Sequence, residues 1–211
     1  MPILPPARPN DEMHLLATLF KPHAKEHKLK AKVKIKFNPP TPFEERCAFI
    51  LSSGEAAIYR NNSSLLISHI FPGAIFGLAE IFCPYAANYL RAETDCTFYT
   101  INAPKVMMVL SESNAWPVLT KVLSYYLQYL TYRDLNMVGN TTYRLIRNCI
   151  YEYHDLPPEI RDNQALSCFI QNKTALSRSL IMKILLTLRT GGYIEIKKGR
   201  LVKMNKLPLE Y

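Results

Sequence analysis

The spacing of apolar residues changes from helical to strand-like near the start of the chain. Residues 11–20 repeat apolar side chains at every third or fourth position behind Asp11, which predicts a short amphipathic helix capped by that aspartate. Residues 29–37 then alternate strictly between apolar residues and lysines, the period of a strand with one buried face. The lysines could also form a stripe for nucleic acid, but charge opposite an apolar face favours a solvated strand.

Short runs of β-prone residues follow, separated by turn-forming stretches. We expect strands at 47–52, 56–60, 65–70, 89–92 and 97–101. The intervening Ser-Ser-Gly and Asn-Asn-Ser-Ser have the composition of turns. Regularly spaced short strands predict a roll, sandwich or barrel.

From about Lys105 the period becomes helical again and predicts a long helix that ends before Gly139. Five apolar residues follow a 4, 3, 4, 7 spacing, which is a heptad seam suited to pairing two copies of the chain: Leu119, Leu123, Tyr126, Leu130 and Met137. Arg133 interrupts this seam. The alternative is that the helix packs wholly against its own domain.

The C-terminal part predicts a winged helix-turn-helix. Residues 140–155 carry apolar side chains on one helical face until Pro157 and Pro158 interrupt the pattern. A short helix from Ser167 to about Asn172 precedes a second helix that begins near Ser177 and ends at two glycines. Two β-prone runs then flank Lys-Lys-Gly-Arg at 197–200, a basic hairpin tip or wing.

Positive charge is concentrated in this C-terminal segment. Residues 163–206 hold nine Lys or Arg and one acid, Glu195, so they carry +8 of the formal net charge of +9. A clustered basic surface indicates a polyanionic partner. Double-stranded DNA is therefore the first partner to consider.

The expected roles within the helix-turn-helix follow from its geometry. Ser177 is suited to cap the second helix, and Arg178, Ser179, Met182 and Lys183 lie opposite its apolar stripe. Arginine can bind guanine with two hydrogen bonds, and the wing cations can hold phosphates. The predicted DNA-binding residues are Lys173, Thr174, Ser177, Arg178, Ser179, Lys183, Lys197, Lys198 and Arg200. The alternative is a basic surface on a winged domain that contacts protein.

Other chemistries have little support in the sequence. The five cysteines are widely spaced among apolar neighbours, which favours a reducing cytoplasm over a disulfide framework or a metal site. We find neither a signal peptide nor a membrane span. No Gly-rich phosphate loop or catalytic triad appears, so we predict no catalytic residue, no cofactor and no enzymatic activity.

Two stretches resemble the Crp/Fnr superfamily of bacterial regulators: Pro72–Gly77 at its pocket loop and Leu176–Leu185 at its recognition helix. A nearer resemblance is to a divergent subgroup, the IprA-like proteins, through Ile75–Ala79, Leu135–Tyr143, Ser177–Ser179, Gly192–Glu195 and Leu207–Tyr211. The resemblance implies an α+β fold with three parts: a helix and cyclic-nucleotide-binding-like β-roll (1–110), a dimerisation helix (111–138) and a winged helix-turn-helix (139–211). It also implies a homodimeric transcriptional regulator, with promoter DNA and RNA polymerase as candidate partners.

The residues that bind cyclic nucleotides in this superfamily are missing. Its members use a Gly-Glu pair for the ribose and an Arg-Ser pair for the cyclic phosphate, but here Leu78 follows Gly77, and Ala86 and Ala87 replace Arg-Ser. A buried phosphate without its arginine would be costly, so we expect no cyclic AMP binding. Arg91 is a weak substitute for the missing arginine of the Arg-Ser pair. We therefore regard Gly77, Leu78, Ala86, Ala87 and Arg91 as a degenerate pocket.

Three readings of this pocket stay open. Side chains fill it, an apolar small molecule occupies it, or Cys83 senses a redox signal there. For the protein as a whole, a second function stays open: an adaptor, whose dimer binds another regulator and whose winged domain contacts protein. Salt-dependent affinity for duplex DNA separates a regulator from an adaptor.

Overall fold

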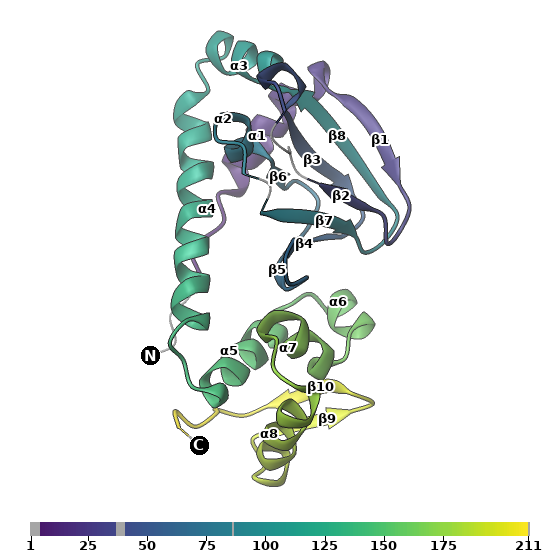
Figure 1. The fold of residues 1–211 in the computed structure, drawn as a ribbon, viewed down its shortest axis with the longest axis vertical. Helices are drawn as coiled ribbons and strands as arrows, with labels where there is room; N and C mark the ends of the chain where they lie inside the picture. Colours follow the sequence, from purple (N-terminus) through teal and green to yellow (C-terminus); the bar gives the residue numbers. More distant parts are fainter. Residues whose placement is uncertain (1–4, 37–40, 86, 211) are drawn as a thin grey trace. The chain divides into compact units, whose positions relative to one another are not determined.

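The structure is a computed structural model that describes residues 5–36, 41–85 and 87–210. The chain forms two compact units, one ending at Thr131 and the other beginning at Tyr132, so the boundary falls within a long helix. Figure 1 shows the mixed architecture of strands and helices that the α+β class predicts. Among the described residues, no helix is both long and apolar enough to cross a bilayer.

Two four-stranded antiparallel sheets form the roll of the N-terminal unit. The first has the order β1 (Lys25–Leu29), β8 (Cys96–Asn102), β3 (Cys47–Ser53) and β6 (Ile75–Phe76). The second has the order β2 (Lys34–Lys36), β7 (Asn88–Ala92), β4 (Ala56–Arg60) and β5 (Leu66–Ile70). The strands predicted from short β-prone runs are confirmed as β3, β4, β5, β7 and β8.

The predicted single strand over 29–37 is wrong. β1 ends and β2 begins inside this stretch, and the two strands belong to different sheets. Lys32 adopts a φ of 72° in the connection, and Asp95 accepts hydrogen bonds from the Ala31 amide at 2.9 Å and from Lys30 Nζ at 2.7 Å. The alternation thus continues through a turn held by a distant aspartate, and Phe37 lies outside the described residues.

The roll has two apolar layers. Phe49, Leu51, Phe76, Leu90 and Phe98 belong to a cluster with members from both sheets, which therefore fills the space between them. A second cluster covers the other face of the first sheet with four helices: α1 (Asn10–Phe20), α2 (Leu78–Phe82), α3 (Ala103–Glu112) and α4 (Trp116–Met137). Figure 1 shows α1, α2 and α4 on the same side of these strands. Short 3-10 helices at Lys21–His23 and Phe43–Glu45 complete the unit.

The predicted helix over 11–20 is confirmed as α1, although its cap is not. Pro9 occupies the N-cap position without a side-chain hydrogen bond, and Asp11 lies in the first turn. A carboxylate in the first turn still interacts favourably with the positive end of the helix dipole.

The predicted dimer seam of α4 is wrong over its first half. Leu119 is buried, and Leu123 and Tyr126 pack against the core of their own unit. Leu130 is exposed, and the apolar side chains that α4 and the residue after it present to solvent are Leu127, Leu130, Leu135 and Val138. Core-facing and partner-facing helix faces have the same three-to-four-residue spacing, so the pattern alone cannot separate them.

The C-terminal unit is a winged helix-turn-helix, as predicted. Its elements are α5 (Thr142–His154), α6 (Pro158–Asn163), α7 (Leu166–Thr174), α8 (Arg178–Thr190), β9 (Ile194–Lys197) and β10 (Arg200–Met204). Tyr153 of α5 packs edge-on against Phe169 of α7, and its hydroxyl donates to the carbonyls of Arg161 and Gln164. The short helix α6 was not predicted, because Pro158 indicates a break but also suits the first position of a helix.

Candidate nucleic-acid interface and ligand pocket

A tight connection positions the start of α8. Ala175 ends α7 in the left-handed conformation, with φ of 56°, and Ser177 Oγ accepts a hydrogen bond from the Leu180 amide at 3.4 Å. The predicted N-cap is therefore confirmed. The helix then buries Ile181, Leu185 and Leu188. Its opposite face is left to solvent, as a DNA-reading helix requires.

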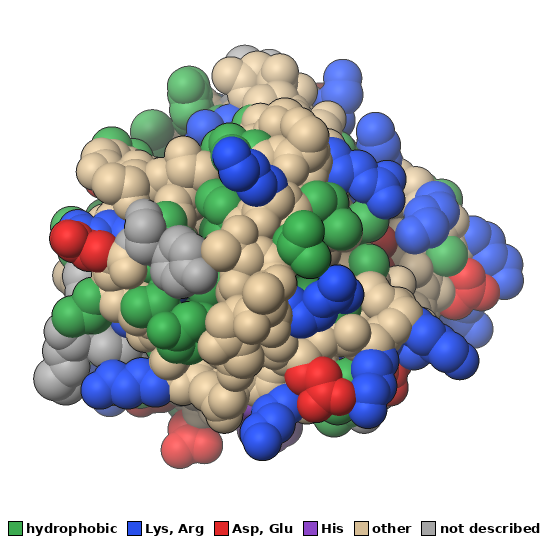
Figure 2. Space-filling model, turned by 90° about the horizontal axis from the view of Figure 1, so that it is seen from below, with side chains coloured by type: hydrophobic (Ala, Val, Ile, Leu, Met, Phe, Trp, Pro, Cys, Tyr) green, Lys and Arg blue, Asp and Glu red, His purple; other side chains and the backbone are tan. Residues whose placement is uncertain are grey.

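Most of the predicted DNA-binding residues lie exposed on α8 and on the β9–β10 hairpin. They are Ser177, Arg178, Ser179, Lys183, Lys197, Lys198 and Arg200. Within the described part of the chain, Arg178, Lys183, Lys198 and Arg200 form no ion pair, whereas Lys197 Nζ lies 2.8 Å from Glu195 Oε1. In the view of Figure 2, blue Lys and Arg side chains outnumber red acidic ones.

The wing is a two-residue hairpin. Lys198 and Gly199 both adopt positive φ, 49° and 80°, between β9 and β10. Positive φ at both central residues is characteristic of a type I′ turn, which follows the natural twist of the two strands. The predicted basic tip is confirmed, and the turn places Lys198 at its end.

Lys173 does not belong to this surface, so its prediction as a DNA contact is wrong. Its side chain is 2% exposed, its ammonium donates to the carboxylate of Glu152, and Nζ lies 5.3 Å from the centre of the Phe169 ring. A buried ammonium is stable only when paired in this way. Thr174, also predicted, uses its hydroxyl within α7, donating to the Ile170 carbonyl at 2.7 Å.

We expect Lys173→Met to leave the salt dependence of DNA binding unchanged. The ammonium is too deeply buried to neutralise a phosphate, and each phosphate contact contributes about −0.9 to the slope of log K against log salt. The slope, measured by fluorescence anisotropy, should match that of the wild-type protein. A slope shallower by about one for each protomer would show that Lys173 contacts a phosphate.

At the degenerate pocket, Leu78 contributes to the hydrophobic core. It is the first residue of α2, is 1% exposed and belongs to the cluster between the first sheet and the helices. Gly77 precedes it with φ of 79°, and a Cβ there would lie 2.7 Å from the Cys47 carbonyl oxygen. Ala87 donates its amide to the Tyr85 carbonyl, while Ala86 lies outside the described residues. No polar group of Leu78 is available to hold a ribose.

Gly77→Ala should destabilise the N-terminal unit by about 2 kcal/mol, because the left-handed conformation and the close approach of backbone both disfavour a Cβ. Urea unfolding followed by circular dichroism tests this. Gly73→Ala is the matched control: its φ is 85°, but nothing lies within 4 Å of the added Cβ. Equal losses in both variants would rule out the steric contribution.

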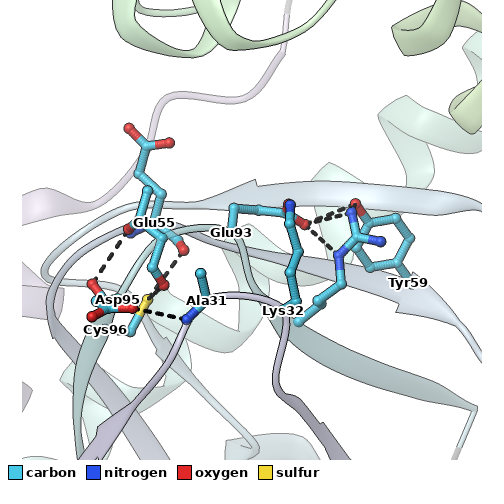
Figure 3. A network of polar contacts seen from close by, with 9 residues as sticks. Ala31, Lys32, Glu55, Tyr59, Glu93, Asp95 and Cys96 are labelled. Carbon is cyan, nitrogen blue, oxygen red and sulfur yellow. Dashed lines mark hydrogen bonds and ion pairs between the residues drawn. The ribbon is translucent and has the colours of Figure 1, made fainter.

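Arg91 is engaged on the opposite face of the second sheet from the roll interior. Its neighbours Leu90 and Ala92 belong to the interior cluster, so alternation along β7 directs Arg91 outward. There its Nε donates to Glu93 Oε1 at 2.8 Å, and its guanidinium lies 4.4 Å from the centre of the Tyr59 ring. Figure 3 shows Tyr59, Lys32 and Glu93 converging at this point. Arg91 thus stabilises the sheet from outside.

This network makes Glu93 sensitive to pH. Burial opposes its ionisation, but hydrogen bonds from Arg91 and Tyr59 outweigh burial and hold the pKa of Glu93 below its ordinary value of 4.5. A lowered folded-state pKa stabilises the fold above the ordinary value, and this stabilisation is lost as pH falls through the folded-state pKa. We expect urea midpoints to fall less steeply below pH 4.5 in Glu93→Gln than in the wild type. Parallel profiles would contradict this role.

Tyrosines of α4 contact β5 and β6, each of which is an edge strand of its sheet. The Tyr126 hydroxyl donates to the Ile75 carbonyl of β6, and the Tyr129 hydroxyl donates to Ser68 Oγ of β5 at 3.3 Å. Tyr125 packs against both rings. Inside the roll, Phe49 stacks on Phe76, which meets Phe98 edge-on. The contact of Tyr129 was not predicted, although three tyrosines within five positions were the signal for it.

The cysteines are all free thiols. Cys83 is exposed just after α2, while Cys96 and Cys149 are buried. Burial raises the pKa of Cys149 to about 12, which keeps it a protonated thiol. No three His, Cys, Asp or Glu side chains come together as metal ligands within the described ranges.

Comparisons with known proteins agree with both halves of this architecture. Residues 43–113 match the family model of the cyclic nucleotide-binding domain, and residues 142–209 match that of winged helix-turn-helix DNA binding. Proteins named "inhibitor of hydrogen peroxide resistance" in Salmonella typhimurium and Escherichia coli K12 are 30% identical over 164 residues, covering 77% of this chain and 79% of each relative.

Solved structures share the fold at low sequence identity. The c-di-GMP responsive regulator CLP of Xanthomonas campestris has a TM-score of 0.68 at 14% identity, covering 90% of this chain and 99% of that one. A CooA mutant from Carboxydothermus hydrogenoformans has a TM-score of 0.66 at 17% identity, covering 88% and 84%. The chain belongs to the IprA family, whose relatives are named inhibitors of hydrogen peroxide resistance, and it has the fold of Crp/Fnr regulators.

Proposed function

We propose that this protein is a sequence-specific double-stranded DNA-binding regulator that acts as a homodimer and does not use cyclic AMP. The observation that carries the proposal is the exposed surface of α8, where Ser177 caps the helix, Arg178 is exposed in the first turn, and Ser179 and Lys183 lie opposite the buried stripe. Arg178 is assigned to a guanine, and Lys183 to a base or phosphate. Lys198 and Arg200 of the wing are assigned to the DNA backbone.

The proposed dimer uses the solvent-exposed stripe of α4. Leu127, Leu130, Leu135 and Val138 are each more than half exposed and recur at spacings that keep them on one side of a helix. Exposed apolar side chains in a continuous row mark an interaction surface. A second copy of the chain provides the same row, so two helices pair symmetrically about a two-fold axis.

Three features of the roll support independence from cyclic AMP. Leu78 is buried where the superfamily has a carboxylate, Arg91 faces away from the interior, and phenylalanine rings occupy the space between the sheets. A cyclic phosphate placed there would lose hydration without gaining a cationic partner, which the protein interior strongly disfavours. We therefore assign the roll a structural role in holding α4.

The relatives' name suggests the physiological output. We extend it to this chain and propose that the regulator lowers resistance to hydrogen peroxide. Deleting its gene should raise cell survival after a peroxide challenge, and restoring the wild-type gene should reverse this. Complementation by Arg178→Ala should fail. If the variant complements fully, the peroxide effect does not depend on DNA reading.

Titration of labelled promoter fragments with purified protein tests the proposed DNA binding. If Lys183, Lys198 and Arg200 of both protomers each neutralise one phosphate, log K should fall against log salt with a slope of about −5. An adaptor that contacts only protein would show no duplex affinity at any salt concentration. That result would overturn the regulator proposal.

A further inference from the structure

Two apolar side chains are exposed on the side of α8 that is proposed to contact DNA. Met182 is 47% exposed and Leu186 is 53% exposed, although the same helix buries Ile181, Leu185 and Leu188. Met182 and Leu186 are one turn apart, so their side chains are neighbours along the helix surface. Neither one contributes to the core of the unit.

Their surroundings are polar and basic. Ser179 lies three positions before Met182, and Lys183 lies three positions before Leu186, so these four side chains form one continuous patch on a helix. Ser179 and Lys183 are exposed, and Lys183 forms no ion pair with any residue that the structure describes. Figure 2 shows apolar side chains lying among Lys and Arg on the face in view.

The combination of a lysine with exposed apolar side chains determines which partner surface can bind this patch. A partner must place negative charge beside Lys183 and an apolar group beside Met182. The major groove of duplex DNA provides both, because phosphates line it and the C5-methyl of thymine is the apolar group that each A·T pair presents there. Methionine is unbranched and polarizable, which suits it to a small methyl group.

We propose that Met182 packs on the C5-methyl of a thymine in each half-site, with Leu186 extending the contact along the groove. This specificity contact rests on the proposed DNA-binding function and adds a base preference to it. Arg178 reads a guanine by hydrogen bonds, whereas Met182 selects thymine by the burial of a methyl group. The operator therefore requires thymine beside that guanine contact.

Uracil isolates this methyl group, because it pairs with adenine as thymine does but lacks the C5-methyl. The same duplex, selected with the wild-type protein from random sequences, is prepared once with thymine and once with uracil. Burying one methyl contributes about fourfold in affinity, so two half-sites should give a loss of about 15-fold in the wild type.

The variant that tests the contact is Met182→Ala, which is not expected to affect folding because the side chain is already half exposed. It should bind thymine DNA about as weakly as the wild type binds uracil DNA, and replacing thymine by uracil should cost it less than twofold. Leu209→Ala is the matched control, an exposed leucine beside the Pro208 carbonyl that Tyr143 holds. It should keep the full uracil penalty.

Each other outcome overturns the inference. An equal uracil penalty in the wild type and in Met182→Ala would place the thymine contact elsewhere. Steep salt-dependent binding with no uracil penalty would remove the methyl contact but leave the DNA-binding function intact. If the wild type shows no duplex affinity at any salt concentration, both proposals fail.

Discussion

Arg178→Ala combined with Lys198→Ala is expected to weaken operator binding by about 30-fold to more than 1,000-fold, because the proposed dimer loses two guanine contacts of about 1–3 kcal/mol each and two weaker wing contacts in addition. Arg178 is exposed on the first turn of α8 and Lys198 at the tip of the wing, and neither forms an ion pair with a described residue. The single variants should separate the two roles. Losing Arg178 should relax the preference for one base pair, whereas losing Lys198 should weaken all sequences alike.

Fluorescence anisotropy with the selected duplex and a scrambled duplex measures both effects. The charge-matched control is Lys28→Ala with Lys36→Ala, two exposed lysines of the roll. It removes the same net charge at a distance from α8 along the chain, so operator affinity should change little beyond the effect of overall charge. If this control loses as much affinity as the α8 and wing variant, then the protein binds DNA by overall charge and not through these residues.

Leu127→Glu with Leu130→Glu should convert the proposed dimer to monomers. Both leucines are exposed on α4, and a pair of like charges in a symmetric interface repels its own copy across the two-fold axis. Since the two recognition helices would then bind independently, affinity for a two-half-site operator should fall by about 100- to 10,000-fold. Sedimentation velocity measures the oligomeric state, and anisotropy measures the affinity.

A separate glutamate variant, Leu15→Glu, provides the control for solubility and charge, because Leu15 is an exposed leucine on α1. It should remain dimeric and bind normally. The seam predicted from the sequence included Leu119, Leu123 and Tyr126, but these residues pack in the core of their own unit. Substituting those residues should unfold the N-terminal unit. If Leu127→Glu with Leu130→Glu stays dimeric, the exposed stripe of α4 is not the interface.

Local signals in the sequence were sufficient to predict the start of α8 and the wing. A serine before a helical stripe predicted the cap at Ser177, and Lys-Lys-Gly-Arg between two β-prone runs predicted the wing. Each depends on residues within a few positions of one another. The strands of the roll were predictable for the same reason, since alternation and turn composition are local properties.

Features that depend on distant partners were not predictable. Charge suggested Lys173 as a DNA contact, but Glu152 lies 21 residues earlier and the packing of α5 on α7 buries the pair. The turn after β1 depends on Asp95, more than 60 residues away. Arg91 was assigned to the degenerate pocket, but its partner Tyr59 on the outer face of the sheet becomes visible only once β4 pairs with β7.

The central claim is that this regulator reads DNA without cyclic AMP. The most direct measurement compares operator affinity of nucleotide-free protein with and without saturating cyclic AMP, at one moderate salt concentration. We predict tight binding in both cases and affinities equal within about twofold, because Leu78 is buried in the core and Arg91 faces away from the roll interior. Weak binding that strengthens tenfold or more on adding cyclic AMP would contradict the account.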